Sequence, residues 1–447
     1  VVDAAHAPED EGWVPAQVLR GLRLQGLAMR WPDPWIAVPL AGGGRLELWR
    51  DMARSVEAIR RVSPRDAERW PAFCKRMARL ARFLAALYAA PPPDPLSLGF
   101  ALRARRLGRQ GLQDLLRILP MPVAELLDDW FESDALKGAL GAVGVLHFLQ
   151  GPRSGGTAFR LLHHHVGCPT GVFRPGRSNI LELLRKLPRV ELQQTEVAGI
   201  SVRAGAVTGV ALKDGRSVEA SLVVSSADPR RSLLEFVEPG WLDPELARAL
   251  RHVRRRGVAS RLRLQLDRSP GFAALALAPS LDYLERAYDD AKYGDFSRRP
   301  YLDIIIPSTL DPSMAPPGKH VMSIFVQYAP YHLKHGTWPQ RREALGDTVI
   351  DTLSEYAPNF KNIILHRQVV TPWDLEQEFG LTEGNIFQGE LTLDQLFFLR
   401  PVPGWAKYRT PIKNLYMCGA CTHPGGGVMA ASGRLAALEI LKDWKRI

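Results

Sequence analysis

The amino-acid sequence predicts an α/β fold in which two domains interleave along the chain. Three observations lead to this prediction. Apolar residues recur at helical spacing over residues 51–150, short alternating segments follow from residue 190, and the stretch 415–444 has the order strand, glycine loop and helix. A length of 447 residues, 46% of them apolar, is sufficient for two or three domains with buried cores.

Residues 51–150 are predicted to form a helical subdomain. Phe73, Met77, Leu80 and Leu84 follow one another at three- and four-residue spacing, which places them on one side of a helix. Prolines at positions 91–93, 120 and 122 interrupt the pattern, because proline ends or kinks a helix. The region should therefore contain several helices rather than one.

The periodicity becomes strand-like after residue 190. Residues 190–193, 200–203, 207–212 and 217–224 each predict a short strand, and the Lys-Asp-Gly-Arg sequence at 213–216 predicts a hairpin turn. Together these segments predict a β-meander that ends in a buried strand.

A second sheet is predicted further along the chain. Residues 261–266, 301–306 and 321–328 alternate or run apolar as strands do, and a proline-rich loop over 307–317 separates the last two. Helical spacing returns over residues 341–356. The class is therefore α/β or α+β, with helices and strands of different domains alternating in the sequence.

Composition excludes several classes of protein. The chain is 23% charged, which together with its apolar content excludes a disordered protein, and its net charge of +11 favours anionic partners. Four cysteines are too few for a disulfide scaffold, so we expect a reducing compartment. The longest weakly charged run, residues 135–150, is shorter than the roughly 20 residues that cross a bilayer, which predicts no transmembrane helix.

The glycine-rich segment over residues 414–434 is the most informative stretch. A short apolar strand ends at Gly419, three glycines stand at 425–427, and a helix is predicted to begin near Val428. Glycine lets the backbone approach a ligand closely, and a helix N-terminus presents unpaired N–H groups and a positive dipole end. Such a site suits an anion or the N1–C2=O edge of a flavin. The alternative is a glycine-rich turn that binds no ligand.

The order of residues in this segment resembles the C-terminal flavin-contacting motif of the phytoene desaturase-like FAD-dependent oxidoreductases. The matching residues are Cys418, Gly419, His423, Pro424, Gly425, Gly426, Gly427, Val428, Gly433 and Arg434. Other segments resemble the branch of this family that includes the mammalian pyridine nucleotide-disulfide oxidoreductase domain-containing protein 2. They are residues 306–320, 355–360, 384–387, 394–396 and 400–401, so the likeness extends over most of the chain.

The resemblance implies an FAD-binding Rossmann-like domain, lacking its first βαβ unit, interleaved with an α+β substrate domain. The FAD-binding domain is expected at residues 171–240 and 405–447, and the substrate domain at residues 1–170 and 241–404. By the same resemblance the cofactor is FAD, and the chain is an oxidoreductase that takes a hydride from a C–H bond of a lipophilic, polyene-like substrate.

The resemblance also implies the site residues. His423 is the catalytic candidate, either positioning groups or transferring a proton near the isoalloxazine, and no metal is expected. The expected FAD contacts are Val197, whose backbone would hold adenine, Asp228 in the loop 226–229, and Gly419, Thr422, Pro424, Gly425, Gly426, Gly427 and Val428.

Departures from the family pattern carry their own expectations. Residues 174–179 replace a glycine-rich turn, and Gln388 stands where relatives commonly have His. The sequence contains no strand followed by Gly-x-Gly-x-x-Gly and a helix, the unit that binds a dinucleotide pyrophosphate. It also starts at Val1 without Met and without a basic-then-apolar leader. We therefore expect a missing segment before Val1 and weak FAD binding by this chain alone.

Three other clusters have competing interpretations. Cys418 and Cys421 have the spacing of a dithiol pair, but residues 422–427 separate them from the helix N-terminus that would lower a thiol pKa, so we expect structural thiols. One of the adjacent histidines at 163–165 is a candidate for the substrate site. The seven arginines within residues 248–263 form either a solvated face or a phospholipid-binding surface, and nucleic acid is not expected because no aromatic residues accompany them.

An apolar substrate pocket is expected between the helical segment and the second sheet. Its candidate lining residues are Phe325, Tyr328, Phe379, Phe387 and Phe397. Amines remain open as substrates, and the rival hypothesis is a catalytically degenerate, flavoprotein-like binding or regulatory protein. The expected location is the cytoplasm or a peripheral membrane surface, and a mitochondrion if the source is eukaryotic.

Overall fold

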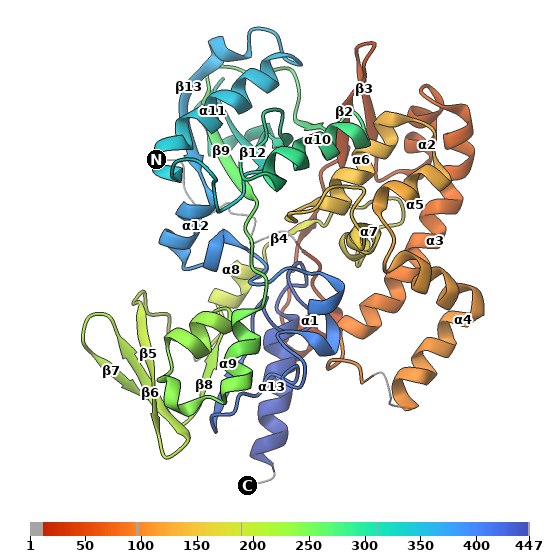
Figure 1. The fold of residues 1–447 in the computed structure, drawn as a ribbon. Coiled ribbons are helices and arrows are strands. Elements are labelled where there is room, and N and C mark those ends of the chain that lie inside the picture. Colours follow the sequence, from red (N-terminus) through yellow and green to blue (C-terminus); the bar gives the residue numbers. More distant parts are fainter. Residues whose placement is uncertain (1–11, 95–97, 189, 310, 446–447) are drawn as a thin grey trace.

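The computed structural model describes residues 12–94, 98–188, 190–309 and 311–445. Figure 1 shows a helical region formed by the first part of the chain, an antiparallel sheet with its own helices, and a smaller region that contains the C-terminal helix. The glycine segment lies where these regions meet. The domain boundaries expected from the sequence stay a prediction.

Helices occupy most of residues 51–150, as predicted. They are α2 (Met52–Arg60), α3 (Pro64–Tyr88), α4 (Leu98–Ile118), α5 (Val123–Trp130) and α6 (Asp134–Val145), followed by α7 (Thr157–His165). α3 begins where the Ser63 hydroxyl accepts a hydrogen bond from the N–H of Asp66. Its buried face packs Trp70 and Phe73 against Phe131, which follows α5. This aromatic contact joins α3 to the α5–α6 pair.

Short elements precede and follow the helical region. They are α1 (Ala16–Leu22), β1 (Met29–Arg30), β2 (Ile36–Pro39), β3 (Arg45–Leu48), β4 (Arg177–Ser178) and α8 (Ile180–Arg185). β2 and β3 form an antiparallel hairpin, and β1 pairs with β4, so the two ends of the helical region meet.

The predicted second sheet is confirmed. Its strands are β9 (Ala259–Leu266), β10 (Ala274–Leu277), β11 (Tyr301–Ile305), β12 (His320–Gln327) and β13 (Ile364–Val370), in the spatial order β10-β11-β12-β9-β13 with every pair antiparallel. Leu262, Leu264 and Leu266 alternate along β9 and enter a core shared with α11 (Trp338–Ser354). Arg261 and Arg263 therefore point to the opposite face, because successive side chains of a strand alternate.

The meander is confirmed in part. Its strands are β5 (Val197–Arg203), β6 (Ala206–Leu212) and β7 (Ser217–Glu219), and the chain then enters β8 (Val223–Ser225). The strand predicted over residues 190–193 was wrong: these residues have no regular structure, and the side chain of Leu192 is 66% exposed. Apolar alternation alone does not make a strand, because the backbone also needs a neighbouring strand for its hydrogen bonds.

β8 also differs from the prediction of a buried strand. Its residues are half-buried or exposed, and Val224 is 40% exposed. β8 pairs in parallel with β14 (Leu415–Met417), so segments almost 200 residues apart meet side by side. This pairing places the end of β14, and with it Gly419, beside the loop that follows β8.

The C-terminal helix α13 (Ala431–Trp444) begins three residues later than predicted. The N–H of Trp13 donates to the Gly427 carbonyl (2.9 Å) and the N–H of Met429 donates to the Trp13 carbonyl (2.8 Å). These bonds form an isolated β-bridge between Trp13 and Val428, and Ala430 turns the chain with φ 55° before the helix starts. The contact is long-range, so the local sequence could not reveal it.

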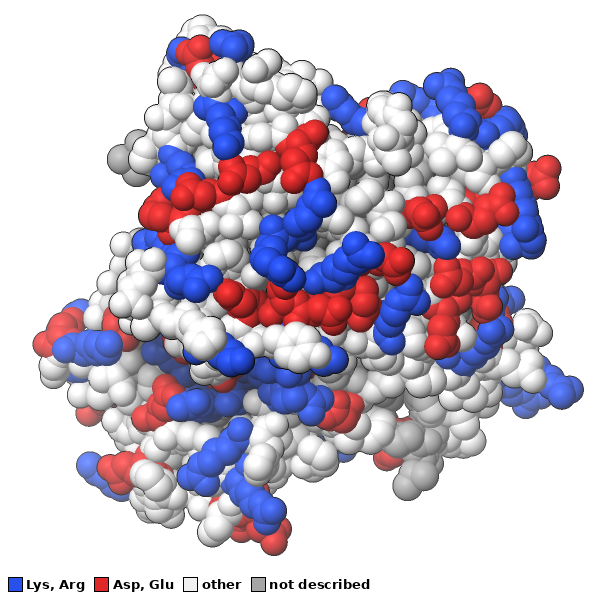
Figure 2. Space-filling view, turned by 45° about the horizontal axis from the view of Figure 1, so that its top comes forward, with Lys and Arg blue, Asp and Glu red and all other residues white. Residues whose placement is uncertain are grey.

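Further α-helices are α9 (Pro244–Arg251), α10 (Leu281–Lys292) and α12 (Pro372–Phe379). Among the described residues, every helix is too short or too polar to cross a lipid bilayer. Figure 2 shows Lys and Arg interspersed with Asp and Glu over the face that it presents.

The arginine run over residues 248–263 does not form one surface. Arg255 is buried, Arg254 pairs with Asp394 (2.7 Å) and Arg256 pairs with Glu390 (2.6 Å). Arg261 and Arg263 belong to the cavity described below. Arg248 and Arg251 are exposed in the last turn of α9 (Pro244–Arg251), so the run is divided among a core position, ion pairs, a cavity wall and the surface.

Candidate active site

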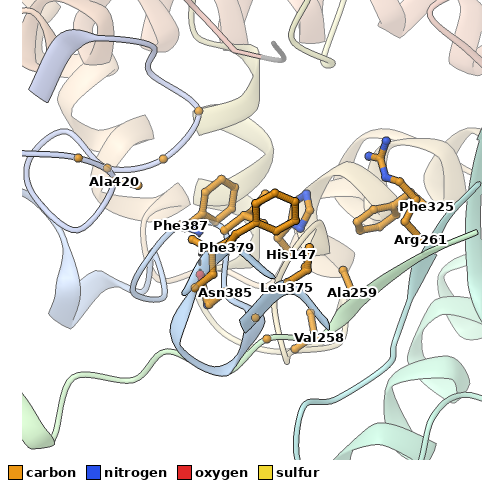
Figure 3. Close-up of a pocket in the computed structure, with 18 of the residues that line it drawn as sticks. His147, Val258, Ala259, Arg261, Phe325, Leu375, Phe379, Asn385, Phe387 and Ala420 are labelled. Carbon is orange, nitrogen blue, oxygen red and sulfur yellow. Dashed lines mark hydrogen bonds between the residues drawn. The ribbon is translucent and has the colours of Figure 1, made fainter. Parts of the chain in front are cut away.

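A cavity of about 940 Å³ lies between the glycine segment and the antiparallel sheet. Residues 256–263, 368–387 and 418–433 contribute most of its wall, and His147, Ser226 and Phe325 complete it. Figure 3 shows His147, Phe379 and Phe387 grouped together, with Arg261 and Phe325 further along the cavity. The lining is mainly apolar and includes Val258, Ala259, Phe325, Val370, Leu375, Phe379, Leu381, Ile386, Phe387, Val428, Met429 and Ala430.

The three consecutive glycines form one wall of the cavity. Gly425 and Gly427 have φ values of 101° and 81°, which favour glycine. Gly426 meets the Phe387 ring so closely that an added Cβ would lie 1.9 Å from the ring atom Cδ1. The fold therefore requires glycine at 425 and 427 for the backbone conformation and at 426 for close packing against Phe387.

A hydrogen-bond chain from α3 and α7 holds the glycine backbone. The Nε2 atom of His163 lies 3.0 Å from the Gly426 carbonyl and must donate to it, so Nδ1, 2.8 Å from the Tyr88 hydroxyl, accepts from that hydroxyl. Burial, with a smaller effect of Arg160, lowers the pKa of His163 to about 3. The ring therefore stays neutral near pH 7 and keeps this arrangement of donors.

Arg400 holds the glycine segment from the other side. Its guanidinium is buried and donates to the backbone carbonyls of Ala420, Phe387, Gly389, Glu390 and Gln395. The distances are 3.0, 2.8, 3.1, 3.1 and 3.1 Å, respectively. Burial lowers the pKa of Arg400 to about 10, so the group remains charged at neutral pH. We call Arg400 and the five carbonyls that it binds the Arg400 hub. The sequence analysis missed it, because an arginine before a proline does not indicate such a set of hydrogen bonds.

The structure brings part of the predicted cofactor set together. Gly419, Gly425, Gly426, Gly427 and Val428 line the cavity. Thr422 is buried, its hydroxyl donates to the Gly419 carbonyl (3.0 Å), and neither it nor Pro424 belongs to the lining.

Two other predicted contacts lie apart from the cavity lining. Val197 starts β5, and Asp228 is buried, with its carboxylate accepting from the N–H of Arg230 (2.9 Å) and from the Thr382 hydroxyl. The assignment of these residues to FAD stays a prediction.

His423 also lies outside the lining of the cavity. Its ring is fully buried, with Nε2 3.2 Å from the Leu87 carbonyl at the end of α3. Burial lowers the pKa of His423 to about 4, so the ring is neutral near pH 7. The contact of His423 with the Leu87 carbonyl holds the loop against α3. The catalytic role of His423 stays a prediction.

The aromatic candidates divide between wall and core. Phe325, Phe379 and Phe387 line the cavity, whereas Tyr328 and Phe397 pack outside its lining. None of the three histidines at 163–165 belongs to the lining. His147 does, and its ring lies 4.8 Å from Phe325 and 5.2 Å from Phe387 between centroids. The sequence analysis missed His147, because a single histidine outside any motif does not indicate a place in a cavity.

The thiols of Cys418 and Cys421 are free, Cys418 is half-buried and Cys421 is buried, and both belong to or contact apolar core clusters. Burial raises the pKa of Cys418 to about 11 and also raises that of Cys421. A dithiol relay needs a thiolate near neutral pH, so this environment is that of structural thiols. Within the described ranges, His, Cys, Asp and Glu side chains nowhere gather in a group of three or more that could hold a metal.

We expect the thiol of Cys418 to react slowly with iodoacetamide at pH 8 and about tenfold faster for each pH unit up to about pH 10, because the thiolate fraction follows the raised pKa. Mass spectrometry of the folded protein measures this rate. Replacing both Cys418 and Cys421 with Ala should leave turnover within about threefold. Rapid labelling at pH 7, or a large loss of turnover with normal flavin content, would contradict structural thiols.

Comparison with known proteins places the chain in a family. Residues 20–441 match the model of the flavin containing amine oxidoreductases. The pyridine nucleotide-disulfide oxidoreductase domain-containing protein 2 of Rattus norvegicus is 33% identical over 479 residues, which cover 95% of this chain and 82% of the relative. A phytoene desaturase (lycopene-forming) of Pseudescherichia vulneris is 26% identical, over 95% of this chain and 86% of the relative.

The fold agrees with this assignment. Wild-type putrescine oxidase bound to putrescine superimposes with a TM-score of 0.57 at 11% identity, over 97% of this chain and 87% of that structure. The resemblance seen in the glycine segment is thus confirmed over most of the chain. The chain belongs to the flavin-containing amine oxidoreductase family and is an FAD-dependent oxidoreductase of the amine oxidase and desaturase type.

Proposed function

We propose that FAD binds with its isoalloxazine against the glycine loop and that a lipophilic substrate occupies the apolar part of the cavity facing it. The observation that carries this proposal is the glycine wall itself. Gly425, Gly426 and Gly427 present bare backbone to a cavity of about 940 Å³, large enough for a ring system and part of a substrate. A side chain at Gly426 would collide with Phe387.

The start of α13 supports the fit to a flavin. The N–H groups of Ala431, Ser432 and Gly433 have no acceptor within the described part of the chain, and Ser432 and Gly433 line the cavity. Unpaired N–H groups at a helix N-terminus stabilise negative charge, which a flavin gains on reduction. The residues present therefore fit FAD, whereas a glycine-rich turn without a ligand would leave these donors unused.

The division of labour follows from these positions. Bound FAD supplies the acceptor for a hydride from a substrate C–H bond. Gly419, the three glycines and Val428 would hold the ring, and the donors of α13 would stabilise its reduced form. We assign Asp228 and Val197 to more distant parts of FAD. Phe379, Phe387 and Leu375 would exclude water and orient the substrate chain.

The charges of the cavity favour a neutral lipophilic substrate over an amine. The charged side chains in its lining are Arg256, Arg261, Arg263 and Glu378, and Glu390 balances the charge of Arg256, so two further cations accompany the single acid of the described lining. A protonated amine would meet like charge and would lose hydration against an apolar wall. The phytoene desaturase among the relatives supports a polyene-like substrate, whereas the likeness to putrescine oxidase concerns the fold.

The glycine wall gives a prediction about FAD binding. Gly426→Val should weaken FAD binding at least about tenfold, because the added side chain displaces Phe387 and fills the space beside the loop. Gly240→Val is the matched control, since an added Cβ there has open space around it. The measurement is the FAD dissociation constant from a spectroscopic titration of each variant. Wild-type affinity in a folded Gly426→Val protein would contradict the proposed ring site.

The substrate class gives a prediction about turnover. Under anaerobic conditions, a long-chain polyene in detergent micelles should bleach the bound flavin, and a primary amine should not. Leu375→Asp should lower kcat/KM for the polyene about tenfold or more with FAD content unchanged, because a carboxylate is poorly solvated in the apolar wall. Gln377→Glu adds the same charge on α12 at an exposed position outside the lining and serves as the control.

Reduction by the amine alone would contradict the substrate class. Reduction by neither compound, nor by other lipophilic candidates, in a protein that binds FAD normally would favour the rival hypothesis of a binding or regulatory protein.

A further inference from the structure

The outer face of helix α4 exposes leucines that the fold does not cover. Leu98, Leu102 and Leu116 are 77%, 53% and 60% exposed, and Leu112 is 37% exposed. They form two pairs at four-residue spacing, one on each side of the kink at Gly108. Residues four apart lie on the same side of a helix, so each half of α4 presents two neighbouring leucines.

The packing of α4 explains why these leucines face outward. The carboxylate of Asp114 is buried and accepts from Arg76 (2.7 Å) and Arg79 (2.6 Å), both on α3. Leu115 and Ile118 are buried on the same side of the helix. The acidic residue of this segment is therefore turned toward α3, and the second half of α4 is held with Leu112 and Leu116 away from the core.

Cations accompany the exposed leucines. Arg105, Arg106 and Arg109 are exposed, and no carboxylate of the described residues forms an ion pair with them. By their helical positions, Arg105 and Arg106 lie on the side of Leu98 and Leu102, and Arg109 lies on the side of Leu112 and Leu116. Figure 1 shows α4 at the outer edge of the helical region, where a large flat partner can reach it.

We infer that α4 is a docking surface for an anionic phospholipid bilayer. Leucine side chains enter the boundary between headgroups and acyl chains, and the long arginine side chains lie along that boundary and reach the phosphates. This combination distinguishes a membrane from other partners. A second copy of the chain would bring like charges together, and single-stranded nucleic acid is bound through exposed aromatic rings, whereas the exposed apolar residues of this face are leucines.

This surface is different from the arginine run over residues 248–263, in which Arg248 and Arg251 are exposed and the other arginines are divided among ion pairs, the core and the cavity. The inference goes beyond the proposed function and does not rest on it, because bilayer binding by α4 needs neither FAD nor a substrate. A bilayer would bring the chain to the phase in which a lipophilic substrate dissolves.

The test is flotation of the full chain with vesicles of phosphatidylcholine alone and with vesicles that contain phosphatidylglycerol as about one third of the lipid. We expect binding to the anionic vesicles that weakens with salt, and little binding to the neutral ones. The triple variant Arg105→Gln, Arg106→Gln, Arg109→Gln should lower the partition coefficient at least about tenfold. Leu98→Ser with Leu102→Ser should lower it several-fold.

The control variant carries Arg248→Gln, Arg251→Gln and Arg286→Gln, three exposed arginines elsewhere, and removes the same net charge. It should bind as the wild type does, within about twofold. Equal losses in the two triple variants would overturn the inference, because binding would then reflect net charge alone. Equal binding to both vesicle types would also overturn it, as would leucine-dependent self-association without vesicle binding. Matching melting temperatures establish that each variant is folded.

Discussion

The guanidinium of Arg400 determines the shape of the active-site loops. It donates to carbonyls on two segments, 387–395 and the Ala420 region, and both segments contribute to the cavity or to its support. A buried carbonyl without a donor loses its hydration without compensation, which costs about 1–3 kcal/mol for each group. Five such carbonyls share one cation, and their dipoles stabilise its charge in place of a carboxylate.

The positions of the other site residues follow from this hub. The Phe387 carbonyl is held by Arg400, so the Phe387 ring is fixed against Gly426, and the carbonyl of Gly426 is held in turn by His163. Tyr408 donates to the His423 carbonyl (3.0 Å) and secures the turn before the glycines. The glycine wall is thus shaped by buried donors from α7 and from the loops 387–400 and 405–408, so little reorganisation is needed when a planar ring binds beside it.

The sheet side and the loop side of the cavity present different groups. β9 turns Leu262, Leu264 and Leu266 toward α11, and the same alternation turns Arg261 and Arg263 toward the cavity. The loop side presents backbone donors and glycines. The proposed FAD and the proposed lipophilic substrate would thus bind to different surfaces of one cavity, as suits an oxidoreductase of this family.

The sequence predicted features that depend on local pattern. The alternation in residues 261–266 and 321–328 was sufficient to predict β9 and β12, and the three glycines were sufficient to predict a wall of bare backbone. Features that depend on distant partners were missed. Residues 190–193 lack a neighbouring strand despite their pattern, and α13 starts late because Trp13 binds the backbone of Gly427 and Met429 before it.

The partners of buried polar side chains also could not be predicted from local sequence. His423 matched a flavin motif, yet its ring packs against the end of α3, and nothing in the sequence distinguishes these two orientations. Arg400 stood in a segment of family likeness without any indication that it binds five carbonyls. A histidine or arginine side chain is long enough to reach several sites, so its partners are decided by the tertiary fold.

The FAD affinity of Arg400→Lys tests most directly whether buried donors shape the flavin site. A lysine has one nitrogen and cannot reach all the carbonyls that Arg400 binds. We therefore predict that the FAD dissociation constant of this variant is at least about tenfold higher. Arg255→Lys is the matched control, because Arg255 is equally an internal arginine but donates to one carbonyl, that of Leu250 (3.2 Å). Its FAD affinity should change by less than about threefold. A folded Arg400→Lys protein with wild-type FAD affinity would contradict the claim that Arg400 shapes the flavin site. Equal losses of FAD affinity in both variants would contradict it as well.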